Sequence, residues 1–151
     1  MNVYVATDLA GCHNTRRSTS GYILLFNNCC PSWLSKKQAS VSKSTTKAEF
    51  VAMSYSTSHI RWLLNGLADL RLQGVIGMHA NTAGANILAV NPHINVRTKH
   101  IGVDSWITGE PLEDNLFVLL KVEWVNNHAE MYTKILAKLA HQGMCALLGC
   151  R

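Results

Sequence analysis

Apolar and polar positions along the chain follow two different periods, and the first period is typical of β-strands. Residues 2–9 form an apolar run with β-branched side chains, and residues 22–26 form an aromatic-rich run directly after Gly21. Residues 32–35 continue this pattern around Trp33, after two turn-forming asparagines at 27 and 28. Short apolar runs between turn residues favour strands, so we expect a meander of three strands here.

The period changes after Ser44, and the new pattern predicts a long helix over about residues 45–70. Ser44, Thr45 and Thr46 offer an N-cap, and Glu49 falls within about the first turn, near the positive end of the helix dipole. The apolar positions that repeat with a spacing near 3.6 are Ala48, Val51, Ala52, Tyr55, Trp62, Leu63, Leu67 and Leu70. We therefore expect these positions to form one buried stripe.

The rest of the sequence continues to alternate between strand-like and helix-like segments. In chain order we expect a strand at 75–80, an alanine-rich helix at 82–90, a helix at 99–109, a strand at 116–125 and a last helix at 129–140. This succession is typical of an α/β fold, a mixed sheet with helices on both faces. No internal repeat is present, and 151 residues are enough for one domain with a substantial core.

Composition and charge narrow the class of protein. Apolar residues make up 48% of the chain and charged residues 15%, which is typical of a compact globular domain. The longest apolar run is too short for a membrane span, and the first residues do not resemble a signal peptide. The formal net charge of +5 is compatible with a phosphate-bearing partner, although many solvated surfaces carry a similar excess.

The cysteines indicate the redox environment. They number five, at positions 12, 29, 30, 145 and 150, and no two of them form a CxxC pair. This arrangement favours reduced thiols and an intracellular protein, cytoplasmic or nuclear and not secreted. A zinc site built from Cys12, His13 and Cys29 is poorly supported by their spacing.

Five blocks of the sequence resemble one known family. They are RRSTSGY at 16–22, SWLSKKQ at 32–38, STTKAEFVAM at 44–53, NPHINVRTKHI at 91–101 and NHAEMYTKIL at 127–136. In this order they closely resemble the ribonuclease H domain of copia-type LTR retrotransposon Pol polyproteins.

The resemblance implies a ribonuclease H-like fold, with a five-stranded mixed sheet in which three antiparallel strands precede two parallel ones. We expect this domain to occupy residues 1–142 as a monomer, followed by a C-terminal tail at 143–151. In an intact polyprotein a reverse transcriptase domain is expected upstream, so its absence here suggests a decayed or truncated copy.

Members of the family cut the RNA strand of RNA–DNA hybrids with two Mg²⁺ ions, and the resemblance implies the same partner and cofactor. Two dications about 4 Å apart need convergent carboxylates. In the family, the first acid lies in the motif YSDADWAGC. The corresponding residues 4–12 of this sequence are YVATDLAGC, so the resemblance implies that Ala6 replaces the metal-bridging aspartate. Asp8 matches the second aspartate, but two residues along a strand span about 7 Å. We therefore interpret Asp8 as a residue of the rim.

The other three acid positions differ in how well they match the family. Glu49 matches the glutamate of the family's STTEAEY block, although by itself it would be an ordinary glutamate near a helix cap. ANTAGANILAVNP at residues 80–92 aligns with CDNQSA-x-x-LAKNP, so Asn81 replaces the third acid. Glu130 stands where N-x-AD-x-x-TK has an aspartate, and it keeps the charge. We interpret His128, two residues earlier, as an exposed polar cap residue in preference to a proton shuttle.

Only Glu49 and Glu130 then remain as acidic metal ligands. Loss of one positioned catalytic group costs about a hundredfold or more in rate, so we expect weakened Mg²⁺ binding and impaired cleavage in this degenerate copy. Two alternatives remain open, a catalytically silent nucleic-acid-binding module and a decayed remnant without activity.

Seven basic residues fall in three segments that the family's fold is expected to bring near the substrate. They are Arg16, Arg17, Lys36, Lys37, Lys43, Arg97 and Lys99. Such residues neutralise phosphates without a metal site, although solubility alone explains them about equally well. Trp33 could stack on a base or sugar, but an aromatic residue on a strand is more often part of the core.

Overall fold

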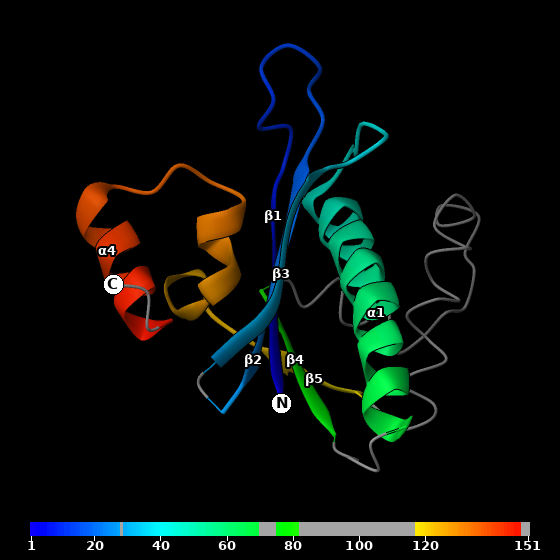
Figure 1. Cartoon of the computed structure of the whole chain (residues 1–151). Helices are drawn as coiled ribbons and strands as arrows, with labels where there is room; N and C mark the ends of the chain where they lie inside the picture. Colours follow the sequence, from blue (N-terminus) through cyan, green and yellow to red (C-terminus); the bar gives the residue numbers. More distant parts are fainter. Residues whose placement is uncertain (28, 70–74, 82–116, 149–151) are drawn as a thin grey trace.

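The computed structural model describes residues 1–27, 29–69, 75–81 and 117–148, and its centre is a five-stranded sheet (Figure 1). The strands are β1 (Asn2–Asp8), β2 (Thr19–Phe26), β3 (Cys29–Lys37), β4 (Ile76–Ala80) and β5 (Phe117–Lys121). They lie in the order β3-β2-β1-β4-β5. The first three are antiparallel, and β4 and β5 run parallel to β1, as expected.

Helices cover both faces of this sheet, which confirms the predicted architecture. The long helix α1 (Thr45–Asp69) lies on one face. The other face carries the 3₁₀ helices η2 (Trp124–Asn126) and η3 (His128–Tyr132) and the helix α4 (Lys138–Leu147). The helices expected at 82–90 and 99–109 lie outside the described residues.

Alternation along β1 divides its side chains between the two faces. Val3 and Val5 join the core beneath α1, together with Phe50 and Met53 of that helix. Ala6 points to the opposite face and packs in a second cluster with residues near η3. The two faces of the sheet therefore have separate cores.

The start of α1 agrees with the sequence, but part of its stripe does not. Ser44 caps the helix, because its Oγ accepts a hydrogen bond from the Lys47 amide at 3.2 Å. Trp62, which we expected to be buried, is 77% exposed. The helix turns about 100° per residue, so Trp62 points away from the sheet when Ile60, 1% exposed, points into it.

The C-terminal elements differ most from the prediction. The last strand ends at Lys121, and the helix expected over 129–140 is split between η3 and α4. The side chains of Asn127 and Thr133 form local hydrogen bonds, to the amide of Ala129 and to the carbonyl of Glu130, and these bound a single short turn. The helix α4 runs through residue 142, at which we expected the compact domain to end.

No helix in the described part of the chain is both long enough and apolar enough to span a membrane.

Candidate active site and nucleic-acid interface

The two positions at which family acids are replaced lie next to each other in the sheet. In the parallel pair of β1 and β4, Val5 is opposite Ala80. The next residues along the chain are Ala6, on β1, and Asn81, directly after the end of β4. Neighbouring strands are about 4.8 Å apart. The structure therefore brings Ala6 and Asn81 together at the same level of the sheet, as a shared metal site would require.

The short helix η3 lies very close to the sheet at this level. Ala6 is paired with Gly21 on β2, and a Cβ atom on Gly21 would lie 2.7 Å from Cγ2 of Thr133. Only glycine allows this approach without a shift of η3. Beneath η3, Ala6 is 3% exposed and packs in one apolar cluster with Ala129. The position of the family's first acid is thus a closed apolar contact.

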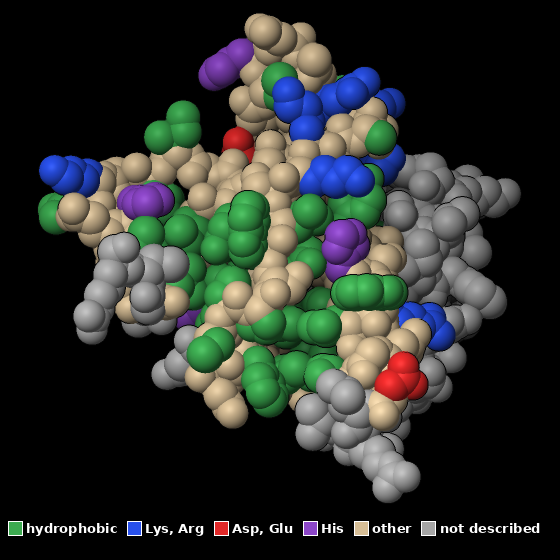
Figure 2. All heavy atoms as spheres, in the orientation of Figure 1, with side chains coloured by type: hydrophobic (Ala, Val, Ile, Leu, Met, Phe, Trp, Pro, Cys, Tyr) green, Lys and Arg blue, Asp and Glu red, His purple; other side chains and the backbone are tan. Residues whose placement is uncertain are grey.

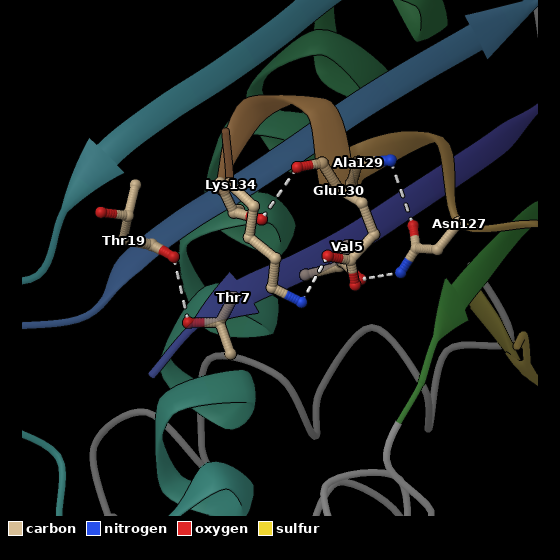
Figure 3. A network of polar contacts seen from close by, with 8 residues as sticks. Val5, Thr7, Thr19, Asn127, Ala129, Glu130 and Lys134 are labelled. Carbon is tan, nitrogen blue, oxygen red and sulfur yellow. Dashed lines mark hydrogen bonds and ion pairs between the residues drawn. The ribbon is translucent and has the colours of Figure 1, made fainter. Parts of the chain in front are cut away.

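Glu130 carries the one acidic side chain that η3 contributes. The residue is only 6% exposed, and its Oε2 forms an ion pair with Nζ of Lys134 at 2.6 Å. Figure 3 shows both side chains extending from the η3 segment toward β1, where the ion pair lies close to Val5 and Thr7. The carboxylate therefore reaches the predicted site, and it arrives there already paired with a cation.

Glu49 lies at the same end of the sheet on the other face. The buried side chain of Gln38 connects the start of α1 to β2, because its Nε2 donates to Ser20 Oγ at 2.8 Å and to the Ala48 carbonyl at 2.9 Å. Ser20 is paired with Thr7 of β1, one residue beyond Ala6. Glu49 follows Ala48 and is half-buried.

Asp8 does not take the place of the missing aspartate. A Cβ atom on Gly11 would lie 1.7 Å from Oδ2 of Asp8, so this carboxylate lies directly against the loop between β1 and β2. The interpretation of Asp8 as a rim residue agrees with this geometry.

The donor set of the described residues does not fit a pair of magnesium ions. Within these residues no three His, Cys, Asp or Glu side chains converge so that they could hold a metal ion. Ala6 offers no oxygen, Asn81 offers an uncharged amide, and Glu130 is bound to an ammonium group. Hard dications need several oxygen ligands and anionic charge, and the described residues at this end of the sheet provide no converging set of three such ligands.

Basic side chains gather near the same end, over the β1–β2 loop and the start of α1 (Figure 2). Lys36 and Lys37 end β3 opposite Ser20 and Thr19, and Arg16 and Arg17 lie in the loop that precedes β2. All four are exposed, and so is Lys43. The structure thus brings two of the three expected basic segments together, whereas Arg97 and Lys99 lie outside the described residues.

Cys12, in the β1–β2 loop, has an unusual environment that the sequence did not indicate. Hydrogen bonds from Thr15 and from Lys37, whose Nζ lies 3.1 Å from Sγ, lower the pKa of the Cys12 thiol to about 6. A sequence signal for a thiol with a low pKa is a cysteine close in sequence to hydroxyl and basic side chains. Thr15 is close to Cys12 in this sense, but Lys37 is 25 residues away in sequence. None of the cysteines among the described residues, at 12, 29, 30 and 145, forms a disulfide.

Two aromatic contacts correct the expectations for Trp33 and His128. Trp33 is 60% exposed and stacks on Tyr132, with ring centroids 5.5 Å apart, so it is not a core residue. His128 packs against Tyr4 at 4.4 Å between ring centroids, and its side chain is partly covered. On its other side Tyr4 stacks on His79 at 4.5 Å.

This cluster lies on the same face of the sheet as Ala6, with Tyr4 two residues nearer the start of β1 and packed against the apolar cluster of Ala6. Burial lowers the pKa of both histidines, and the nearby His128 lowers that of His79 further. The position of His128 against Tyr4 favours a packing role. A cavity of about 420 Å³ beside the cluster is lined by Met1, Asn2, Tyr4, Leu25, Phe26, Asn27 and His128.

Comparison with solved structures places this architecture in a known fold. The chain aligns with LC11-RNase H1 in complex with RNA/DNA hybrid, isolated from compost, at a TM-score of 0.63, covering 87% of this chain and 92% of that one. The identity is 10%, so this likeness establishes the ribonuclease H fold alone.

Comparison with known sequences found similar polyproteins. No protein-family model matches the sequence. The chain is 33% identical over 136 residues, 89% of its length, to the retrovirus-related Pol polyprotein from transposon TNT 1-94 of Nicotiana tabacum. It is 29% identical over 151 residues, 99% of its length, to the corresponding polyprotein from transposon RE1 of Arabidopsis thaliana. Over nearly its whole length, this chain is therefore similar to copia-type retrotransposon Pol polyproteins. It spans about 10% of the length of these two Pol relatives.

The predicted site positions can be compared with the structure, which adds a cation that the sequence analysis did not predict. The motif predicted that Ala6, Asn81 and Glu130 share one region, and the structure places them at one end of the sheet. Lys134 was not considered as a partner of Glu130. Its spacing of four residues was an available signal, since side chains at i and i+4 meet along a helical turn.

Proposed function

We propose that this chain is a ribonuclease H-like domain whose metal-dependent cleavage of RNA–DNA hybrids is impaired and whose nucleic-acid binding persists. The observation that carries the first half is the position of Ala6 and Asn81, each one residue beyond the paired Val5 and Ala80 of β1 and β4. Two neighbouring acid positions of the family's site thus carry no negative charge. The fold of the LC11 enzyme, which was solved with RNA/DNA hybrid, supports the choice of ligand.

The impairment follows from electrostatics. Two divalent ions bring four positive charges, and the family offsets them with converging carboxylates. Here Glu49 and Glu130 provide two negative charges, and Lys134 already offsets one of them. A weakly held and displaced metal would no longer orient the attacking water, and loss of one such group costs about a hundredfold or more.

Nucleic-acid binding requires fewer groups of the protein than cleavage does, because it needs no metal ion. One exposed edge carries four basic side chains, those of Arg16, Arg17, Lys36 and Lys37. They can neutralise backbone phosphates without a metal. Each phosphate contact releases counterions, so the affinity falls as salt rises. The second candidate function, a catalytically silent nucleic-acid-binding module, is supported by this basic edge alone. The third, a remnant without activity, would require that this edge bind no hybrid.

A pair of assays on the whole chain tests the proposal. A labelled RNA–DNA hybrid incubated with excess protein and either Mg²⁺ or Mn²⁺ should give no metal-dependent product. A fluorescence anisotropy titration of the same hybrid at two salt concentrations should show binding that weakens with salt. Metal-dependent cleavage would contradict the impairment, and no binding at low salt would leave only the remnant.

A matched pair of variants locates the binding edge. Lys36→Met with Lys37→Met should weaken hybrid binding and reduce the salt slope by about one for each phosphate that is no longer neutralised. Lys121→Met with Lys138→Met removes the same charge from exposed positions away from this edge and should change little. Equal losses in both pairs would show that net charge alone governs the binding.

A further inference from the structure

A histidine and a cysteine lie side by side on α4, outside the candidate active site. His141 and Cys145 are four residues apart, so both side chains leave the same side of the helix, and Sγ of Cys145 lies 3.6 Å from Nδ1 of His141. Neither residue belongs to the five blocks that resemble the family, since the last block ends at residue 136. Imidazole nitrogen and thiolate sulfur are typical ligands of Zn²⁺. The pair is therefore a candidate metal site that the proposed function does not use.

The distance between the two ligand atoms fits a zinc ion. Zn–S bonds are about 2.3 Å long and Zn–N bonds about 2.0–2.1 Å, and the ligands of a structural zinc ion form a tetrahedron. These lengths and a tetrahedral angle place a bound sulfur and a bound nitrogen about 3.6 Å apart. The observed separation is 3.6 Å. The two side chains thus have the spacing of two corners of a tetrahedral zinc site before any ion binds.

Hydrogen bonds and packing hold the helical turn that carries this pair. The His141 amide donates to the Ala137 carbonyl at 2.9 Å, and the Leu148 amide donates to the Met144 carbonyl at 3.1 Å. Leu148 is 9% exposed and packs in the apolar cluster that contains Ala6. Because this turn is already formed, binding of an ion costs little backbone entropy.

The electrostatics of α4 favour a cation beside Cys145. This residue lies in the last turn of the helix, which ends at Leu147. The C-terminal end of a helix is the negative end of its macrodipole and therefore favours cations. Lys138 is the one charged residue in the sequence of α4, and it lies about 10 Å from Cys145 along the helix axis. Its repulsion of an ion at Cys145 is weakened by salt, which screens charges over about 8 Å.

One chain supplies only half of a tetrahedral site. Among the described residues no third His, Cys, Asp or Glu side chain joins this pair in a metal-binding group. His141 is exposed, Cys145 is partly exposed, and Figure 1 shows α4 at the outside of the molecule, so a second chain can reach the pair. A two-fold axis through the ion brings the same two residues from both chains. The result is the Cys₂His₂ ligand set of many structural zinc sites.

We propose that His141 and Cys145 are half of a zinc site, and that a second copy of this chain completes it as a Cys₂His₂ centre. The chain is a monomer without zinc and a dimer with it, at one Zn²⁺ for two chains. Each Cys145 thiol releases its proton to the solvent as its sulfur binds Zn²⁺, so the affinity rises with pH. This dimer uses no residue of the candidate active site, and it does not depend on the proposed function.

A Co²⁺ titration of the whole chain, followed by absorption spectroscopy in the presence of a phosphine reductant, tests the site. Tetrahedral Co²⁺ can replace Zn²⁺ at such sites, and a bound thiolate gives it a charge-transfer band in the near ultraviolet. The wild type should develop this band, reach saturation at one Co²⁺ for two chains, and lose the band when ZnCl₂ displaces the Co²⁺. Sedimentation velocity should show a dimer in ZnCl₂ and a monomer after addition of EDTA.

A matched pair of double variants locates the ligands. Cys145→Ser with His141→Ala changes two side chains on an exposed helix, so circular dichroism should show an unchanged fold while the band and the dimer are lost. Cys29→Ser with His13→Ala removes the same two types of side chain from exposed positions elsewhere and should behave as the wild type.

Two results would overturn the zinc site. One is a wild type without the charge-transfer band, and the other is a band that Cys145→Ser with His141→Ala leaves unchanged. Binding of one ion per chain by a monomer would overturn the role of the second copy.

Discussion

On the α1 face of the sheet a large cluster of apolar side chains is buried, whereas the η3 face combines a smaller apolar cluster around Ile23 with small and polar side chains. Phe50, Met53 and Ile60 fill the first face, and Ala6, Ala129 and the Glu130–Lys134 pair lie on the second. Burial of large apolar surface stabilises a fold through many contacts that are each replaceable. A face built on close backbone approach and a few charged groups depends on each of those groups.

This difference shows how the fold can be retained when residues of the candidate site change. The α1 face supplies a ribonuclease H fold without any acid of the site other than Glu49. On the η3 face an alanine at position 6 fits closely beneath Ala129, so the change removes a ligand without opening a cavity there. The described residues therefore keep the fold, and among them no three acidic, histidine or cysteine side chains converge to hold a metal ion.

The largest expected effect comes from opening a cavity on the α1 face. Phe50 is completely buried in that core, and Phe50→Ala should lower the free energy of unfolding by about 3–5 kcal/mol. Urea denaturation followed by circular dichroism measures the change. Trp62→Ala, on the same helix but exposed, should stay within about 0.5 kcal/mol of wild type. A similar loss in both variants would contradict the assignment of the buried stripe.

A methyl group placed between β2 and η3 tests the close approach on the other face. Gly21→Ala brings a Cβ atom to 2.7 Å from Thr133 and 3.0 Å from Tyr132, and we expect a loss of about 1–3 kcal/mol in the same assay.

Gly66 provides the matched control for this substitution. It lies in α1, and apart from its own helix backbone no atom of the described residues lies within 4 Å of an added Cβ, so Gly66→Ala should stabilise the helix by up to about 1 kcal/mol. Effects of the same sign at both glycines would show that η3 does not lie against β2 as described.

The smallest expected effect concerns the reactivity of Cys12 in the β1–β2 loop. The global stability should remain almost unchanged. The rate of Cys12 alkylation by iodoacetamide should rise as the pH increases through about 6 and level off above it, because the thiolate is the reactive form. Removing the hydrogen bond of Thr15 with Thr15→Val should move this midpoint upward, and Lys37→Met should do the same.

Assignment of this rate requires a variant without the thiol. Cys12→Ser should remove the fast phase while the other cysteines still react. A Cys12 midpoint that Thr15→Val and Lys37→Met leave in place would contradict the described hydrogen bonds.

Sequence periodicity predicted the elements whose structure depends on their own residues. The strands around Val5, Ile23 and Leu34 and the helix that Ser44 caps follow from alternation, helical spacing and capping. The break between η3 and α4 did not, because Asn127 and Thr133 form hydrogen bonds that an apolar pattern does not encode.

The site was predictable to the same extent. Family motifs identified Ala6, Asn81 and Glu130, because each motif is a short contiguous block. The exposed stack of Trp33 on Tyr132 and the contact of Lys37 with Cys12 join segments far apart in the chain. Such contacts depend on how η3 and the β1–β2 loop are placed, and spacing alone does not give that placement.

Restoring both acids is the most direct test of the claim that the loss of charge at residues 6 and 81 has inactivated this domain. The measurement is cleavage of a labelled RNA–DNA hybrid in Mg²⁺ or Mn²⁺ by the wild type and by Ala6→Asp with Asn81→Asp, with both folds checked by circular dichroism. The account predicts no product from the wild type and metal-dependent product from the folded double variant. Cleavage by the wild type at the rate of the double variant, abolished by EDTA and by Glu130→Gln, would contradict it.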